Sequence, residues 1–135
     1  MAHMGLTEAE WQVMECLWTS APRTGREIID ALGKTTGWSR STPLTLLRRL
    51  EDKGAVSAVS EGGMKHYRPQ VAREDAAVQE TEHLLERVYQ GSVSLLVSSL
   101  VKKQTLSQEE IDKLYAILRE MEEEHVLNGW YPRVS

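Results

Sequence analysis

The hydrophobic and polar positions of the first half of the chain predict three helices. Capping boxes, in which serine or threonine is followed three residues later by glutamate, occur at Thr7–Glu10, Thr24–Glu27 and Ser107–Glu110. Each box satisfies two amides of a first helical turn, and flanking apolar residues fix the chain's entry at the first and third. Two helices of this half should therefore begin near Glu8 and Gly25, the first ending before Pro22 and the second near Gly33. A later helix should begin near Gln108.

The third helix of this half is expected after Trp38-Ser39 and should end at Gly54. Proline is tolerated only in a first turn, which places Pro43 there. The leucines recur on one face, at Leu46, Leu47 and Leu50.

After Gly54 the sequence pattern changes from the spacing of a helix to that of β-strands. Residues 55–60 and 64–68 read as two strands, joined by Glu61-Gly62-Gly63 and ended by Pro69. Paired glycines supply the positive φ of a tight β-hairpin. Three helices followed by a two-stranded wing describe a winged helix-turn-helix, so the predicted fold is mainly α with a small β-hairpin wing.

Three further helices are predicted after residue 71, each with one apolar stripe. The stripes contain Ala77, Thr81, Leu84, Leu85 and Val88, then Val93, Leu96, Val97, Leu100 and Val101, then Ile111, Leu114, Tyr115, Leu118 and Met121. A single layer of such helices buries little, so we expect packing against a second copy of the chain. Folding back over the first domain as a monomer is the alternative. The expected dimer interface contains Leu84, Leu85, Val88, Val93, Leu96, Val97, Leu100, Ile111, Leu114, Tyr115 and Leu118.

The charged residues divide the chain into a basic central segment and an acidic remainder. The 135 residues are 41% hydrophobic and 27% charged, which suits one ordinary domain or two very small ones. Residues 23–68 hold 9 basic and 5 acidic residues, a balance of +4, and the remainder holds 7 against 15, a balance of −8. A nucleic-acid-binding module joined to an acidic assembly module has this distribution, although uneven surface charge without function would also produce it.

Several classes of protein are disfavoured by what the sequence lacks. The longest nearly uncharged apolar stretch, Ser92–Val101, is half of the ~20 residues that cross a bilayer, so we expect a cytoplasmic protein without membrane contact. Cys16 is the single cysteine and is expected to be buried among apolar neighbours. The chain has no glycine-rich loop after a strand and no Ser-His-Asp order typical of an enzyme. We expect neither catalysis nor a cofactor.

Two Glu-x-x-His patterns raise the alternative of a metal-binding helical bundle. They are Glu80–His83 and Glu122–His125. Glu80 and His83 lie off the apolar stripe of their helix, and the second pair lies near a helix end. We interpret both as solvated polar residues and expect no metal.

The third helix carries the residues typical of a DNA-reading face. Opposite its apolar side lie Ser41, Thr45, Arg48 and Asp52, flanked by Leu44 and Arg49. Hydroxyls bond phosphates or base edges, arginine bonds guanine or phosphate, and leucine suits a thymine methyl. The acidic Asp52 would repel DNA, so the N-terminal half should enter the groove. An ordinary solvated face is the alternative, and the exposed Leu44 counts against it. Arg26, Lys65 and Arg68 are candidates for contact with the DNA backbone.

The order of residues closely resembles the BlaI/MecI/CopY family of bacterial repressors. The resemblance lies in residues 6–14, in Trp38-Ser39, Thr42, residues 45–50 and Lys53-Gly54, in Tyr67-Arg68-Pro69, and in 89–97 and 106–111. It implies a homodimer that binds palindromic operators ahead of resistance or transport genes. By matched position, Ser39, Thr42, Thr45 and Arg49 would contact DNA. The candidate DNA-binding residues are therefore Arg26, Ser39, Arg40, Ser41, Thr42, Leu44, Thr45, Arg48, Arg49, Lys65 and Arg68.

This organisation divides the chain into three parts. A winged-helix DNA-binding domain is expected over residues 5–70, a helical dimerisation domain over 71–127 and a tail over 128–135. The tail contains Trp130-Tyr131, to which we assign no role.

Two departures from the family bear on the inducing signal. The resemblance implies inactivation by cleavage of an Asn-Phe bond, but the matching position reads Ser99-Leu100 and the chain has no phenylalanine. A signalling protease of different specificity, another sensor partner, a small ligand and simple titration remain open. The copper-responsive branch senses metal through cysteine pairs, which a chain with only Cys16 cannot form.

A protein-interaction adaptor is the rival function, since winged helices also serve as docking modules. An adaptor would not need Ser41, Thr45, Arg48 and Arg49 beside a basic wing. Salt separates the two, because affinity for DNA falls steeply with salt when phosphates are neutralised.

Overall fold

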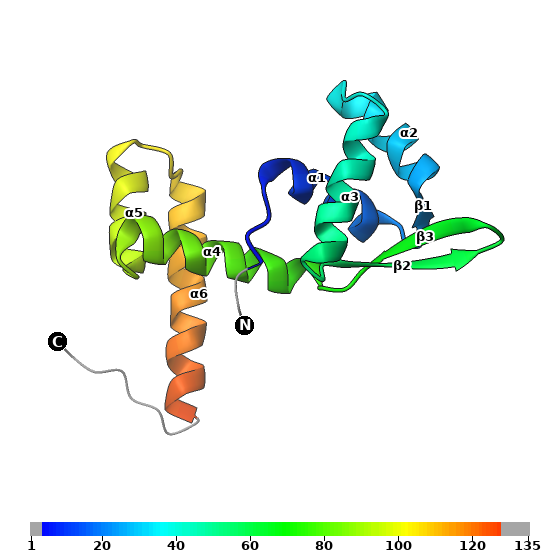
Figure 1. The fold of residues 1–135 in the computed structure, drawn as a ribbon. Coiled ribbons are helices and arrows are strands. Elements are labelled where there is room, and N and C mark those ends of the chain that lie inside the picture. Colours follow the sequence, from blue (N-terminus) through cyan, green and yellow to red (C-terminus); the bar gives the residue numbers. More distant parts are fainter. Residues whose placement is uncertain (1–3, 128–135) are drawn as a thin grey trace. The chain divides into compact units, whose positions relative to one another are not determined.

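The computed structural model describes residues 4–127 and is mainly helical with one small sheet (Figure 1). Its elements are α1 (Glu8–Thr19), β1 (Arg23–Thr24), α2 (Gly25–Thr36), α3 (Ser41–Asp52), β2 (Val56–Glu61), β3 (Met64–Pro69), α4 (Arg73–Tyr89), α5 (Val93–Lys102) and α6 (Gln108–Leu127). This confirms the predicted fold class. The described residues form two compact units, the first ending at Arg87 and the second beginning at Val88. Residues 128–135, the predicted tail with Trp130-Tyr131, lie outside the described residues.

The capping boxes begin their helices as predicted. The Thr7 hydroxyl accepts from the Glu10 amide at 3.1 Å, and Glu10 Oε1 accepts from the Thr7 amide at 2.8 Å. Thr24 and Glu27 make the same pair of bonds at 3.2 and 3.0 Å. At α6, the hydroxyl that precedes the helix accepts from the Glu110 amide at 3.2 Å.

The end of α2 was predicted wrongly. The helix continues through Gly33 to Thr36 and ends at Gly37, whose φ of 71° is left-handed. A glycine inside a helix costs stability without ending it, whereas a left-handed glycine closes the last turn. Of the two glycines, the later one is therefore the cap.

The wing is larger than the predicted two-stranded hairpin. The sheet has three antiparallel strands in the order β1-β3-β2, with Arg23 opposite Tyr67 and Val59 opposite His66. The hairpin turns at Gly62 and Gly63, whose φ values of 59° and 78° suit a tight turn. A two-residue strand is too short to show alternation, which is why β1 escaped the sequence pattern.

The first unit contains a continuous apolar core. Its buried members are Val13, Met14, Leu17, Ile28, Leu32, Leu46, Leu47, Leu50, Ala55, Val56 and Tyr67. They come from α1, α2, α3, the sheet and the residue just before β2, and they include the leucines that the sequence placed on the inner face of α3. Cys16, expected to be buried, is half-buried beside this core, and burial raises the pKa of its thiol.

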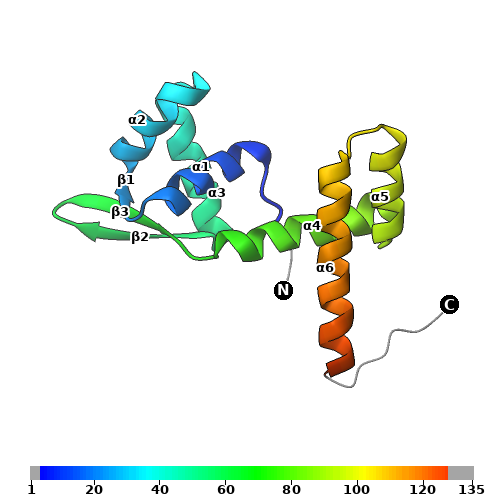
Figure 2. The ribbon, with the colours of Figure 1, turned by 180° about the vertical axis from the view of Figure 1, so that it is seen from behind.

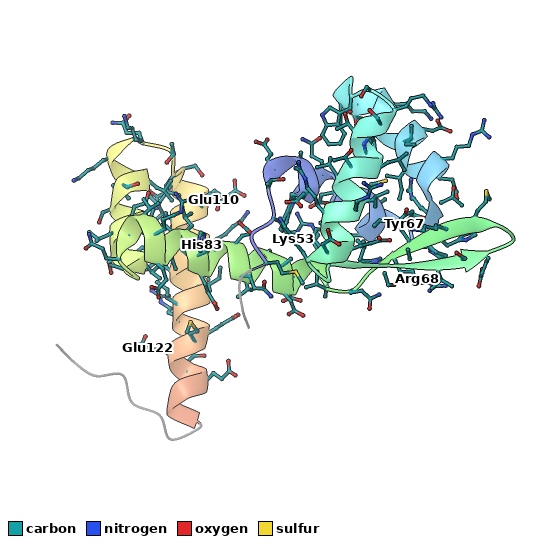
Figure 3. All side chains as sticks on the ribbon, in the orientation of Figure 1. Lys53, Tyr67, Arg68, His83, Glu110 and Glu122 are labelled. Atoms are coloured by element: carbon teal, nitrogen blue, oxygen red, sulfur yellow. The ribbon has the colours of Figure 1, made fainter. Side chains whose placement is uncertain are left out.

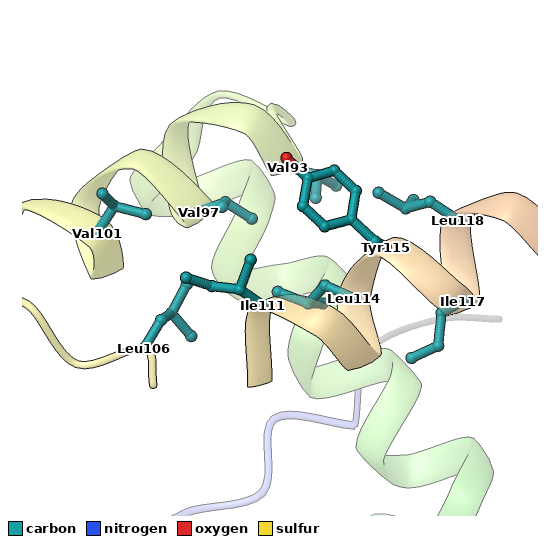
Figure 4. Close-up of a pocket in the computed structure, with 9 residues that line it drawn as sticks. All are labelled: Val93, Val97, Val101, Leu106, Ile111, Leu114, Tyr115, Ile117 and Leu118. Atoms are coloured by element: carbon teal, nitrogen blue, oxygen red, sulfur yellow. The ribbon is translucent and has the colours of Figure 1, made fainter. Parts of the chain in front are cut away.

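The described part of the second unit has no comparable core. Helices α5 and α6 run side by side in both views (Figures 1 and 2). None of the described side chains from Val88 to Glu124 is buried. An apolar hollow of about 450 Å³ lies between the two helices (Figure 4). It is lined by Val93, Val97, Val101, Leu106, Ile111, Leu114, Tyr115, Ile117 and Leu118.

None of the helices within residues 4–127 has the length and apolar character needed to span a membrane. Among the described side chains, no group of three or more His, Cys, Asp or Glu could hold a metal ion. The side chain of His125, from the second Glu-x-x-His pattern, lies outside the described residues.

Candidate nucleic-acid interface

Helix α3 separates its apolar and polar residues as the sequence predicted. Pro43 is buried together with the three leucines of the inner face. Thr42 is half-buried, and the other candidate DNA-binding residues are all exposed. The exposed candidates on α3 are Ser41, Leu44, Thr45, Arg48 and Arg49. The helix therefore offers hydroxyls, an aliphatic side chain and two guanidinium groups on its outer side.

The hydroxyl groups at the start of α3 form a cluster. Ser39 Oγ lies 3.2 Å from Ser41 Oγ and 3.0 Å from Thr42 Oγ1. Thr45 Oγ1 donates to the Ser41 carbonyl at 3.2 Å. The N-cap residue, Arg40, has helical dihedral angles, and its side chain makes no capping bond within the described part of the chain. The Thr42 amide donates to the Ser39 carbonyl at 3.2 Å, and the hydroxyls at this end can bond a phosphate or a base edge.

Leu44 is exposed but not isolated. Its side chain is 47% exposed. A Cβ added at Gly25, the first residue of α2, would lie 3.3 Å from Leu44 Cδ2 and 3.8 Å from Tyr67 Cε2. The absence of a side chain at Gly25 thus allows α2 to approach Leu44 closely. Sequence reasoning placed Leu44 on the outer face but gave no sign of this contact.

Arg40 is engaged on the protein's own surface. Its Nη1 lies 3.5 Å from Asp30 Oδ1, and both side chains are largely exposed. An exposed ion pair of this kind contributes little to stability and exchanges readily for another anion. The guanidinium can therefore turn from Asp30 to a phosphate.

The two basic residues of the wing lie on opposite faces of the sheet. Side chains alternate along a strand, so Lys65 shares a face with Tyr67, and Arg68 lies on the other. Tyr67 is buried in the core, where burial and the nearby Glu51 carboxylate raise the pKa of its phenol. Figure 3 labels Tyr67 and Arg68 on this strand. A DNA backbone on the core side of the wing would meet Lys65, and Arg68 could join it only at the sheet's edge.

A buried ion pair supports α3 from behind. Lys53, just after α3, donates from Nζ to Glu10 Oε1 at 2.5 Å and to the Gly5 carbonyl at 2.8 Å. Burial opposes the charged form of Glu10, but hydrogen bonds from Lys53 and Thr7 outweigh it, so the pKa of Glu10 is lowered. Sequence analysis gave Lys53 no role of its own. The pair joins the start of α1 to the end of α3.

The predicted dimer-interface residues remain accessible in the single chain. Leu84, Val88, Val93, Tyr115 and Leu118 are exposed, and Leu85, Leu96, Val97, Leu100, Ile111 and Leu114 are half-buried. The predicted stripe omitted Ile117, which also lines the hollow between α5 and α6.

The candidate cleavage position lies inside a helix. Ser99 and Leu100 belong to α5, and Ser99 Oγ lies 3.1 Å from the Tyr89 hydroxyl. Proteases bind extended backbone, so cleavage there would require α5 to open locally.

This chain is similar in sequence to known repressors. Residues 6–120 match the family model described as Penicillinase repressor. The Penicillinase repressor of Bacillus licheniformis is 35% identical over 115 residues, which cover 85% of this chain and 90% of that protein. The Methicillin resistance regulatory protein MecI of Staphylococcus aureus (strain N315) is 31% identical over 113 residues, covering 84% and 92%.

A solved structure resembles about half of this chain. The solution structure of the DNA binding domain of the repressor BlaI aligns with a TM-score of 0.51 and 34% identity. The alignment covers 55% of this chain and 90% of that one.

Proposed function

This chain belongs to the penicillinase repressor family, and from that premise we propose that it is a homodimeric transcriptional repressor that occupies a palindromic operator. The observation that carries the proposal is the outer face of α3, where hydroxyls and two arginines stand beside a basic wing on a domain with its own core. The relatives' names, penicillinase repressor and methicillin resistance regulatory protein, support the same role. The regulated genes would then be resistance or transport genes.

In this proposal α3 enters the major groove, and its N-terminal half reads the bases. Ser39 and Ser41 would fix the helix on phosphates, while Leu44 and Thr45 would face base edges. Arg48 and Arg49 would bond guanine or phosphate. The wing and Arg26 would add backbone contacts outside the groove.

The apolar surface of the second unit supports dimerisation. Its apolar side chains remain accessible in one chain, and a second copy would bury them. The two-fold axis of the dimer must match that of the operator, so the half-sites should lie about one helical turn, or a small multiple, apart. Repression would follow from occupancy, which excludes polymerase, and the site of action would be the cytoplasm.

Selection of bound duplexes from a random oligonucleotide pool tests the proposal. We expect a two-fold symmetric consensus, and affinity for it should fall with salt with a slope of about −0.9 for each neutralised phosphate. Failure to enrich any duplex at low salt would contradict it and favour the protein-interaction adaptor.

A single substitution sharpens the test. Arg49→Ala should weaken operator binding by about 1–3 kcal/mol, uniformly across sequences if Arg49 bonds phosphate and at one base position if it reads guanine. Arg119→Ala, which removes an exposed arginine of α6, is the matched control and should leave affinity unchanged. Equal affinity of Arg49→Ala and the unmodified protein would refute both roles for Arg49.

A further inference from the structure

Two side-chain hydrogen bonds join the start of α4 to α1, and a third, within α1, shares an acceptor with one of them. Trp18 Nε1 donates to the carbonyl of Val71, two residues before α4, at 2.8 Å. Arg73 Nε, in the first turn of α4, donates to Glu15 Oε1 at 2.7 Å. The same oxygen accepts from Trp11 Nε1 at 3.0 Å. Glu15 thereby joins an indole of its own helix to the guanidinium of α4.

Ring contacts tie these bonds into one group. The Trp11 and Trp18 rings meet edge to face, with centroids 5.1 Å apart and planes at 68°. The Arg73 guanidinium carbon lies 5.9 Å from the centre of the Trp11 ring, within the range of a cation–π contact. We call Trp11, Glu15, Trp18 and Arg73 the α1–α4 clamp. All four lie within the first unit.

Helix α4 is buried on one side near its start and carries exposed apolar side chains further along. Near its start, Ala76 and Gln79 are 2% and 7% exposed. Val78, Leu84 and Val88 are exposed apolar side chains, and Val88, near the end of the helix, lies about 120° to 180° around it from the two buried residues. The helix continues past Arg87, where the first unit ends. One continuous helix is thus seated on the winged helix at its start and carries predicted dimer-interface residues at its end.

We propose that the α1–α4 clamp sets the direction in which α4 leaves the winged helix, and thereby selects the spacing between operator half-sites that the dimer accepts. This inference rests on the proposed function. Two binding modules joined stiffly gain affinity only at the spacing that their connection spans, whereas a loose connection accepts many spacings with a smaller gain. The clamp residues are positioning residues, because they lie on α1 and α4 and none is among the candidate DNA-binding residues.

The clamp's chemistry suits positioning better than stabilisation. Arg73 and Glu15 are both substantially exposed, and an exposed ion pair adds little to stability. The Trp18 bond is different, since an indole has one donor and one direction, and its acceptor is backbone. Together they hold the angle of α4, and Trp18 and Val71 also pack against the core of the first unit.

The test measures affinity against half-site spacing. The full-length protein is titrated with duplexes that carry two copies of the selected half-site, with the centre-to-centre distance changed one base pair at a time, and with a duplex carrying one half-site. For the unmodified protein, a mismatched spacing should remove an avidity gain of about 10³-fold. For the double variant Trp18→Phe, Arg73→Ala, the loss should shrink to about tenfold, with affinity for the single half-site unchanged.

A matched control and a second variant keep the test decisive. Arg87→Ala removes an exposed arginine of the same helix and should keep the sharp profile. If the double variant melts at a lower temperature, Glu15→Ala, which removes the shared acceptor from an accessible position, replaces it. Coincident spacing profiles of variant and unmodified protein would overturn the inference and leave the repressor proposal intact. Failure of the unmodified protein to bind any duplex would overturn the proposed function itself.

Discussion

The two units satisfy their apolar residues in different ways. In the first, the leucines of α3 and the inner residues of α1 and α2 are buried within one chain. In the second, helices of similar amphipathic pattern leave side chains such as Val93 and Tyr115 more than half exposed. The same kind of stripe therefore forms a complete core in one unit and an accessible apolar surface in the other. Hydrophobic periodicity predicts which face is apolar, but not whether the covering surface comes from the same chain.

The largest effect is expected where a charge enters the second unit's apolar face. Leu100→Glu should convert the dimer to a monomer and lower operator affinity by about 10³-fold, because two linked half-site contacts become one. Sedimentation velocity and an operator titration measure both changes. Ser98→Glu places the same charge on the exposed opposite side of α5 and should leave the dimer intact. An unchanged dimer for Leu100→Glu would refute the assigned interface.

A smaller effect is expected from removing a leucine in the first unit's core. Leu47 is 1% exposed, so Leu47→Ala should lower the free energy of unfolding of this unit by about 3 kcal/mol. Leu95→Ala, at a leucine of α5 that is 48% exposed, should change the free energy of unfolding of the protein by less than about 0.5 kcal/mol. Urea unfolding followed by tryptophan fluorescence compares the two. Equal losses would contradict the contrast between the units.

The ion pair behind α3 should contribute less and depend on pH. Lys53→Met leaves Glu10 buried without its partner, and we expect a loss of about 2 kcal/mol at pH 7 because Lys53 is still 30% exposed. The pKa of Glu10 is lowered from 4.5 in the folded protein, so its stabilisation is present above that value and lost as pH falls through the folded pKa. The difference between variant and unmodified protein should therefore shrink below about pH 4.5. Unfolding curves from pH 3 to 7 measure this difference, and one that is constant across the range would contradict the assignment.

The sequence predicted most of the local structure because its signals are local. The boxes at Thr7 and Thr24 and the leucine face of α3 depend on residues three or four positions apart. The end of α2 was misplaced because Gly33 and Gly37 are both adequate stops in sequence, and only backbone φ distinguishes them. Strand β1 was missed because two residues show no alternation.

The sequence predicted which residues of the candidate interface are exposed, but not the contacts that hold α3 in place. Exposure of Arg48, Arg49 and Leu44 followed from helical periodicity. The contacts that hold the surrounding helices together join residues far apart in sequence. They are Glu10 with Lys53, Gly25 with Leu44, and Trp18 with Val71. No spacing rule relates such pairs. The opposite faces of Lys65 and Arg68 could have been predicted from strand alternation.

Hydrogen exchange of the full-length protein and of Leu100→Glu tests the central contrast most directly. If the second unit is completed by a second copy, amides of α5 and α6 should be protected in the unmodified dimer and exchange rapidly in the variant, while α1, α2 and α3 keep their protection in both. Equal protection of α5 and α6 in the two proteins would show that the second unit folds without a partner, and would contradict the account.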